Sequence, residues 1–276
     1  LKSIKTVKKN SPLPAIKNYN DTIVSLLKNE NIASRVSVYE CYDKNVQGRV
    51  VLERGTSEAG VVAAFNNSFP QEIREVGFSA ALAHNPKIGK INPYLTAQHA
   101  VLEATAKIVA SGSTPVALTD CLCFGNPEKP DRMGEFRATC EGLAKAGSAF
   151  GIPFVSGNVS FYNETTECAV PPTPALLGVG IIEDVRKCIT SDLKAEGELW
   201  IVGETKQEMG GSLYYRESGW DSEIVPQTDV EGFVRDMNAL LDAMDSGEVV
   251  ACHDCSAGGM AIAVIEMCIG GALEAE

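Results

Sequence analysis

The sequence predicts a fold that mixes α-helices and β-strands. Short aliphatic segments punctuated by Gly and Asn are typical of strands, and longer segments with apolar residues on one side are typical of amphipathic helices. One strand–helix–strand succession predicts a βαβ unit, with strands at 115–119 and 152–156 and a helix at 132–150. The two strands of such a unit should run parallel in one sheet. A chain of 276 residues suits two domains of ordinary size.

The first expected domain covers residues 31–184, after a basic linker and a short helix capped by Asp21 within residues 1–30. Its remaining strands are predicted at 49–53, 60–65, 76–82 and 175–182, and a long helix is predicted at 95–111. The polar connector EDVRKCITSDLKAEGE then leads to the second expected domain, 185–276. Strands are expected there in LWIVGET and EVVAC, and helices in the acidic stretch from Val230 and in MAIAVIEMCIGG. Both ends of the sequence are expected to be cuts through a longer protein.

Composition and charge exclude several classes of protein. A hydrophobic content of 45% with 7% aromatics indicates an ordinary globular core. The net charge of −12 argues against a nucleic-acid partner, because phosphate backbones are bound by clustered Lys and Arg. No apolar run is long enough for a membrane helix, and the polar start is not a signal peptide. Nine cysteines without a pairing rhythm indicate reduced thiols, so we expect a cytoplasmic protein without a membrane partner.

Two polar clusters follow the strands of the βαβ unit, in ALTDCLCFGNPEKP (117–130) and VSGNVSFYNET (155–165). Asp120 and Gly157 are expected at the carboxyl ends of the strands, where open α/β sheets bind ligands. Asp120, Asn158 and Ser160 would offer a carboxylate, an amide and a hydroxyl, which suit a nucleotide-bound Mg²⁺. Gly157 would let the backbone approach a phosphate or a base. The same residue types are also the default in turns, so two plain loops are an equal alternative.

Two neighbouring stretches carry weaker signals. In GNPEKP (125–130), Lys129 would reach a phosphate, but a rigid exposed loop is the favoured interpretation. HDCSAGG (253–259) joins a predicted strand to a helix and would suit an anion. His253 and Asp254 would alternatively serve as acid and base, or simply form a hydrogen-bonded turn.

The cysteines give little support to a metal site. A zinc site would have to combine Cys252 and Cys255 with Cys121 and Cys123, and this spacing is poor for zinc. The phosphate-binding loop of P-loop enzymes, the nucleophile elbow of hydrolases and the zinc-protease motif are all missing from the sequence. The familiar kinase, hydrolase and zinc-protease chemistries therefore lack their residues.

The two polar clusters closely resemble signature stretches in the second half of the phosphoribosylformylglycinamidine synthase family, synthetase subunit, of de novo purine biosynthesis. The resemblance extends to PPTPALLGVG, GGSLYY, HDCSAGGMAIAVIEM and residues 31–51, in the family's order. The family belongs to the aminoimidazole ribonucleotide synthetase superfamily, whose enzymes are built from two A–B domain pairs. The resemblance implies an α+β fold in which residues 31–184 form an A domain with ferredoxin-like βαβ elements, half of a barrel with a twin A domain. Residues 185–276 would be a partial α/β B domain.

The resemblance also implies an ATP-dependent amidoligase. ATP activates the formyl amide oxygen of formylglycinamide ribonucleotide, and ammonia that a glutaminase partner releases from glutamine displaces the phosphate. The family's motifs imply ATP contacts at Asp120 and Gly157, a Mg²⁺ ligand at Asn158 and a substrate contact at Ser160. The implied cofactors are therefore ATP and Mg²⁺.

The chain also departs from the family. Relatives carry a D-A-A-V run in the segment that matches 55–65, where this chain has Ser57-Glu58-Ala59-Gly60, and D-P-Y where it has Asn92-Pro93-Tyr94. The family's catalytic histidine and its ATP-contacting lysine belong to the first half, so we expect no catalytic residue here and no turnover by this chain alone. We expect a homodimer that imitates the missing half. The alternatives are a non-catalytic scaffold half and a free-standing kinase-like relative.

Overall fold

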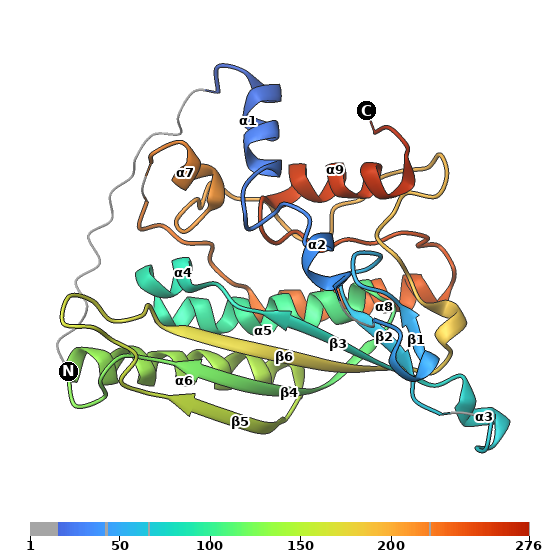
Figure 1. The fold of residues 1–276 in the computed structure, drawn as a ribbon, viewed down its shortest axis with the longest axis horizontal. Coiled ribbons are helices and arrows are strands. Elements are labelled where there is room, and N and C mark those ends of the chain that lie inside the picture. The colour runs from blue at the N-terminus through green and yellow to red at the C-terminus, as the bar shows by residue number, and fades with distance from the viewer. Residues whose placement is uncertain (1–15, 42–43, 66, 221, 276) are drawn as a thin grey trace.

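The computed structural model describes residues 16–41, 44–65, 67–220 and 222–275. Within these residues the centre of the fold is a six-stranded sheet in the order β1-β2-β3-β6-β4-β5 (Figure 1). The strands are β1 (Val50–Leu52), β2 (Gly60–Ala63), β3 (Gly77–Ala83), β4 (Thr114–Cys123), β5 (Phe154–Ser160) and β6 (Thr173–Ile182). Neighbouring strands are antiparallel, except that β4 and β5 are parallel. The predicted βαβ unit and the α+β class are confirmed.

Helices cover one side of the sheet. α5 (Pro93–Ala110) packs on β3 and β6, while α6 (Pro130–Phe150) and α8 (Val230–Asp245) pack against α5. The shorter elements are α2 (Val36–Tyr39), α3 (Gln71–Arg74), α4 (Pro86–Ile91) and the 3₁₀ turns η1 (Val46–Gly48) and η2 (Val185–Lys187). The main core lies between the sheet and this helical layer, where Val101, Ala104, Leu118, Phe124 and Leu176 are almost completely buried. β4 packs into this core through Leu118 and Leu122, and the polar cluster that begins at Asp120 lies on the same strand.

The ends of the two central helices follow from local sequence. The Asn92 side chain accepts a hydrogen bond from the N–H of Leu95, and Pro93 occupies the first turn of α5. Asn92 thus acts as the N-terminal cap of α5. α6 begins at Pro130, and its C-cap after Phe150 is Gly151, which has a left-handed φ of 66°. Gly142 lets the two helices approach closely, because a Cβ there would lie 2.3 Å from the carbonyl oxygen of Tyr94.

A second, smaller group of helices lies above α4, α5 and α8 in the view of Figure 1. It consists of α1 (Tyr19–Leu27), α7 (Leu213–Glu217) and α9 (Gly259–Gly271), which meet around Leu26, Leu213 and Ile262. The predicted cap of α1 is wrong. Asn18 caps the helix by accepting bonds from the N–H groups of Asn20 and Asp21, so Asp21 lies inside the first turn. The predicted linker at 1–15 lies outside the described residues.

Two predicted strands are not formed in the described part of the chain. LWIVGET (199–205) and EVVAC (248–252) run without regular secondary structure, although both have the apolar composition of strands. A strand is stable only when a neighbour pairs with it, and no described segment pairs with either one. Leu199, Trp200 and Val250 are consequently exposed. The described residues after β6 therefore contain helices and no strand, instead of the α/β arrangement expected for 185–276.

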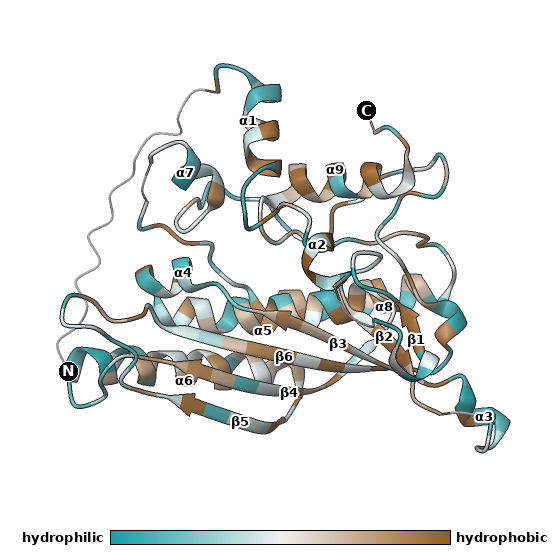
Figure 2. Ribbon diagram, viewed as in Figure 1, coloured by the Kyte–Doolittle hydropathy of each residue, from teal (hydrophilic) through white to brown (hydrophobic). Residues whose placement is uncertain are grey.

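The side of the sheet opposite the helices has exposed apolar residues. Val62, Phe78 and Leu82 alternate with buried neighbours along β2 and β3, and Leu82 is 67% exposed. Figure 2 shows apolar residues along β3, β4 and α9. We call this side of the sheet, as represented by Val62, Phe78 and Leu82, the open face. None of the helices in the described part of the chain has the length and apolar character of a membrane span.

Candidate functional site

The parallel pairing of β4 with β5 brings the two polar clusters together. Asp120 lies opposite Gly157, Cys121 opposite Asn158, and Cys123 opposite Ser160. The prediction that the clusters meet in space is confirmed. They do not lie in loops after the strands, however, because both strands continue past the predicted ends, and β4 stays paired with β6 as far as Cys123. The plain-loop alternative therefore does not describe Asp120, Asn158 or Ser160.

Asp120 and Gly157 lie on the side of the sheet that faces the helices. Side chains alternate along a strand, and Asp120 falls between the buried residues Leu118 and Leu122. A Cβ at position 157 would lie 2.7 Å from Oδ2 and 3.0 Å from Oδ1 of Asp120, so the missing side chain makes room for this carboxylate. Burial raises the pKa of Asp120, and a hydrogen bond that it accepts from the backbone N–H of Asn158 partly offsets this.

Asn158 and Ser160 lie on the opposite side, beside Cys121 and Cys123. The Asn158 Nδ2 atom donates to Cys121 Sγ at 3.5 Å, and the Asn158 side chain is exposed. Ser160 Oγ donates to Asn163 Oδ1 at 3.2 Å. Asn163 Nδ2 in turn donates to the backbone oxygen of Ser160 at 2.8 Å, which fixes the turn after β5. Asn163 is a positioning residue that the sequence did not single out, although it lies in the SFYNET stretch.

This geometry divides the expected Mg²⁺ ligands. An amide oxygen from Asn158 and a hydroxyl from Ser160 suit a hard cation, and both face the same side. The Asp120 carboxylate faces the other side, and two side chains on opposite sides of a sheet cannot bind one ion directly. The expectation that all three would serve one Mg²⁺ therefore needs correction. Asn158 and Ser160 still fit such an ion, and Asp120 pairs with Gly157 instead.

The neighbouring GNPEKP loop is held by ion pairing. Lys129 Nζ forms a salt bridge with Glu164 Oε1, and the other oxygen of Glu164 accepts from the N–H of Asn126 at 2.8 Å. Glu164 therefore ties this loop to the end of the second cluster. With its ammonium group engaged in this way, Lys129 fits the rigid-loop interpretation rather than a phosphate contact.

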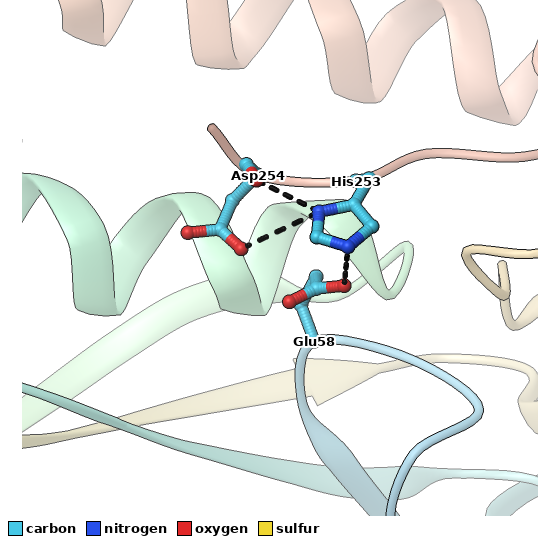
Figure 3. A group of neighbouring side chains, drawn as sticks. All are labelled: Glu58, His253 and Asp254. Carbon is cyan, nitrogen blue, oxygen red and sulfur yellow. Dashed lines mark hydrogen bonds and ion pairs between the residues drawn. The ribbon is translucent and has the colours of Figure 1, made fainter. Parts of the chain in front are cut away.

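A second cluster of ionisable side chains surrounds His253 (Figure 3). Its Nε2 atom lies 3.3 Å from Glu58 Oε1 and 3.1 Å from Glu266 Oε2, and its Nδ1 atom donates to the backbone oxygen of Asp254 at 2.7 Å. Glu58 precedes β2, whereas Glu266 belongs to α9. His253 therefore joins the sheet to the C-terminal helix, and we call His253, Glu58, Asp254 and Glu266 the histidine clasp.

Burial and charge shift the titration of the histidine clasp. Burial disfavours the imidazolium form, but the hydrogen bond to Glu266 and the charge of Glu58 outweigh it and raise the pKa of His253 to about 9. Burial and the neighbouring carboxylate of Asp254 raise the pKa of Glu58 to about 8. Asp254 Oδ1 is buried without a hydrogen-bond partner. His253 is thus held as an imidazolium at neutral pH, beside the carboxyl groups of Glu58 and Glu266.

Ligand atoms of Glu58, His253 and Asp254 all lie within 4.8 Å of one another, close enough for one cation to bridge. The chain already supplies positive charge there, since Lys107 interacts electrostatically with Asp254 and Glu58 and His253 is protonated. We therefore interpret the cluster as an ionic contact between elements. Of the alternatives considered for His253 and Asp254, this favours the hydrogen-bonded turn over acid–base catalysis. The four-cysteine zinc site is not formed by the described residues.

The sheet belongs to a known class. Residues 61–182, which run from β2 to the end of β6, match the family of AIR synthase related protein, N-terminal domain. This segment of the chain therefore belongs to the AIR synthase related family.

Within that class its similarity is to phosphoribosylformylglycinamidine synthase subunit PurL. The PurL of Methanothrix thermoacetophila is 41% identical over 260 residues, which is 91% of this chain and 33% of the relative. The chain thus spans about a third of the length of the curated relatives that it matches.

Solved structures support the same fold. The Thermotoga maritima PurL complexed with FGAR has a TM-score of 0.64 and 18% sequence identity to this chain. The matched region covers 92% of this chain and 39% of the length of that protein chain. The same protein complexed with ADP has a TM-score of 0.50 and 26% sequence identity to this chain. The matched region covers 60% of this chain and 26% of the length of that protein chain.

Proposed function

We propose that this chain is part of the C-terminal half of an ATP-dependent amidoligase of the PurL type. The reaction converts formylglycinamide ribonucleotide, ATP and ammonia from glutamine into formylglycinamidine ribonucleotide. The observation that carries the proposal is the register of β4 and β5, which gathers Asp120, Gly157, Asn158 and Ser160 at one end of the strand pair. The similarity to PurL proteins along 91% of the chain supports it, as does the likeness to a PurL complexed with ADP.

The roles of the residues follow from their two sides of the sheet. Asp120 contacts the nucleotide through its carboxylate, which accepts hydrogen bonds, and Gly157 contacts it through its backbone. Asn158 supplies an oxygen for Mg²⁺, and Ser160 orients the substrate. When bound, Mg²⁺ neutralises the negative charge of the transferred phosphoryl group. The residues of this chain thus position reactants, while the groups that polarise and deprotonate them are expected in the partner half, beside a glutaminase.

Nucleotide binding by this chain tests the proposal. We expect Asp120→Asn and Asn158→Leu each to weaken the binding of Mg·ADP by about tenfold or more in calorimetric titrations, because each removes a charged or oxygen contact. Glu128→Gln is the control, since Glu128 is exposed and its side chain contacts Tyr162 Oη at 3.3 Å. Equal affinities for all four proteins would favour the scaffold alternative.

A turnover assay tests the division of labour between the halves. We expect no formylglycinamidine ribonucleotide from this polypeptide with ATP, ammonia and formylglycinamide ribonucleotide. Product formed by the chain on its own, in proportion to its concentration, would instead favour the free-standing kinase-like alternative.

The open face supports a proposal about assembly. Its apolar residues Val62, Phe78 and Leu82 are exposed in the single chain, and exposed apolar surface of this kind marks an interface. A second copy of this chain presents the same face, so two copies can cover each other as an A domain covers its twin. We therefore expect a homodimer in solution.

A further inference from the structure

Cys121 and Cys123 form a close thiol pair on β4. They are two residues apart on one strand, so their side chains point to the same side of the sheet. The two thiols interact directly, because the pKa of Cys123 is raised by burial and then by the charge and hydrogen bonding of Cys121. Cys121 is exposed and Cys123 is half-buried, and neither forms a disulfide.

The pair lies beside Asn158 and Ser160, the residues proposed for Mg²⁺ and substrate, on the side of the sheet opposite Asp120 and Gly157. Cys121 pairs in register with Asn158, whose Nδ2 atom donates to Cys121 Sγ at 3.5 Å, and Cys123 pairs in register with Ser160. Any group attached to both sulfurs would lie beside the Asn158 amide and the Ser160 hydroxyl. A reagent that reaches the two thiols therefore occupies the space proposed for Mg²⁺ and substrate.

The strand geometry decides what can join the two sulfurs. Residues two apart on a strand have Cα atoms roughly 6.6 Å apart and parallel Cα–Cβ bonds. A disulfide needs Cβ atoms about 3.8 Å apart, so Cys121 and Cys123 cannot form one without moving the backbone. A single large atom that bonds both sulfurs spans the gap without such a movement.

We propose that Cys121 and Cys123 are a dithiol modification site for trivalent arsenicals, and that filling it blocks the neighbouring position proposed for the Mg²⁺ of the bound nucleotide. In the reaction an R–As=O group and two thiols form two As–S bonds and one water molecule. Arsenic stays trivalent, both thiol protons leave in the water, and no oxidant is needed. The part of the proposal that concerns nucleotide rests on the proposed function.

Other thiols of the chain provide the contrast. Cys252 and Cys255 also lie close together, but burial and the carboxylates of Glu58 and Asp254 raise the pKa of Cys252 to about 12. A thiol so strongly protonated and half-enclosed reacts slowly, because the thiolate is the reactive form. Cys252→Ser is therefore the matched control for loss of a thiol outside the site.

Phenylarsine oxide is the probe. Intact-mass measurement should show one bridged adduct per chain, lost in Cys121→Ser and in Cys123→Ser and kept in Cys252→Ser. An adduct that persists in both Cys121→Ser and Cys123→Ser would overturn the site. This readout needs no nucleotide, so it stands even if the chain fails to bind ADP.

A second measurement tests whether the adduct blocks nucleotide binding. The adduct should weaken Mg·ADP binding by about tenfold or more, and a dithiol such as dithiothreitol should restore it by removing the arsenic. Unchanged ADP affinity in the fully modified chain would overturn the proposed block. Absence of ADP binding by the unmodified chain would count against the proposed function instead, and the mass readout would still decide the dithiol site.

Discussion

At the scale of single residues, the contact between Gly157 and Asp120 is the sharpest feature of the β4–β5 pair. Glycine in a strand is normally less stable than alanine by about 0.5–1 kcal/mol. At position 157 an added Cβ would meet the Asp120 carboxylate at 2.7 Å. We expect Gly157→Ala to lower the free energy of unfolding by about 1–2 kcal/mol, measured by urea denaturation, because the carboxylate must move and lose its bond from the Asn158 N–H.

Gly60 supplies the matched control for this prediction. It also lies in a strand, and a Cβ there would have no atom within 4 Å. Gly60→Ala should be neutral or slightly stabilising. In an Asp120→Ala background the cost of Gly157→Ala should disappear, since the clashing group is gone. A cost that persists in that background would show that the clash lies elsewhere.

The sequence could indicate the candidate site only in part. Asp120, Gly157, Asn158 and Ser160 stood out because polar residues interrupt aliphatic strands. The division of these residues between two sides of the sheet depends on the register of β4 and β5, which pairing across the chain determines. Glu58 and Glu266 were not connected with His253, because residues so distant in sequence carry no local signal of contact.

At the scale of elements, the histidine clasp joins the segment before β2 to α9. The folded pKa of His253, about 9, exceeds its ordinary value of 6.5, so its stabilisation is complete below pH 6.5 and is lost as the pH rises through 9. The raised pKa of Glu58, about 8 instead of 4.5, acts in the same direction, and its contribution is lost between pH 4.5 and 8. Urea denaturation should therefore show stability falling from pH 4.5 to 9, most steeply between 6.5 and 8, where both groups contribute, by up to about 1.4 kcal/mol per pH unit for each proton.

His253→Gln should lower stability at pH 7 and flatten this decline. The control is His84→Gln, because His84 is exposed on the loop after β3. A pH dependence that is the same in His253→Gln and in the unchanged protein would show that the histidine clasp does not link protonation to folding.

The elements themselves were predictable to different degrees. The strands and the two long helices of residues 49–182 follow from local pattern, because each finds a partner within the same sheet or helical layer. The strands expected at 199–205 and 248–252 had equally good composition and did not form. Their outcome depends on a pairing neighbour, which composition does not encode.

At the scale of the whole molecule, the open face predicts self-association. Leu82 on this face and Ile269 on α9 are both 67% exposed, so they form a matched pair on opposite parts of the molecule. If two copies cover each other through the open face, Leu82→Lys places a charge in a desolvated contact and should convert the dimer to a monomer. Ile269→Lys adds the same charge to the same kind of exposed aliphatic position and should leave the dimer intact. Sedimentation at micromolar concentration distinguishes these outcomes, with circular dichroism to check folding. An unchanged protein that is monomeric, or a dimer that dissociates only with Ile269→Lys, would exclude the open face as the interface.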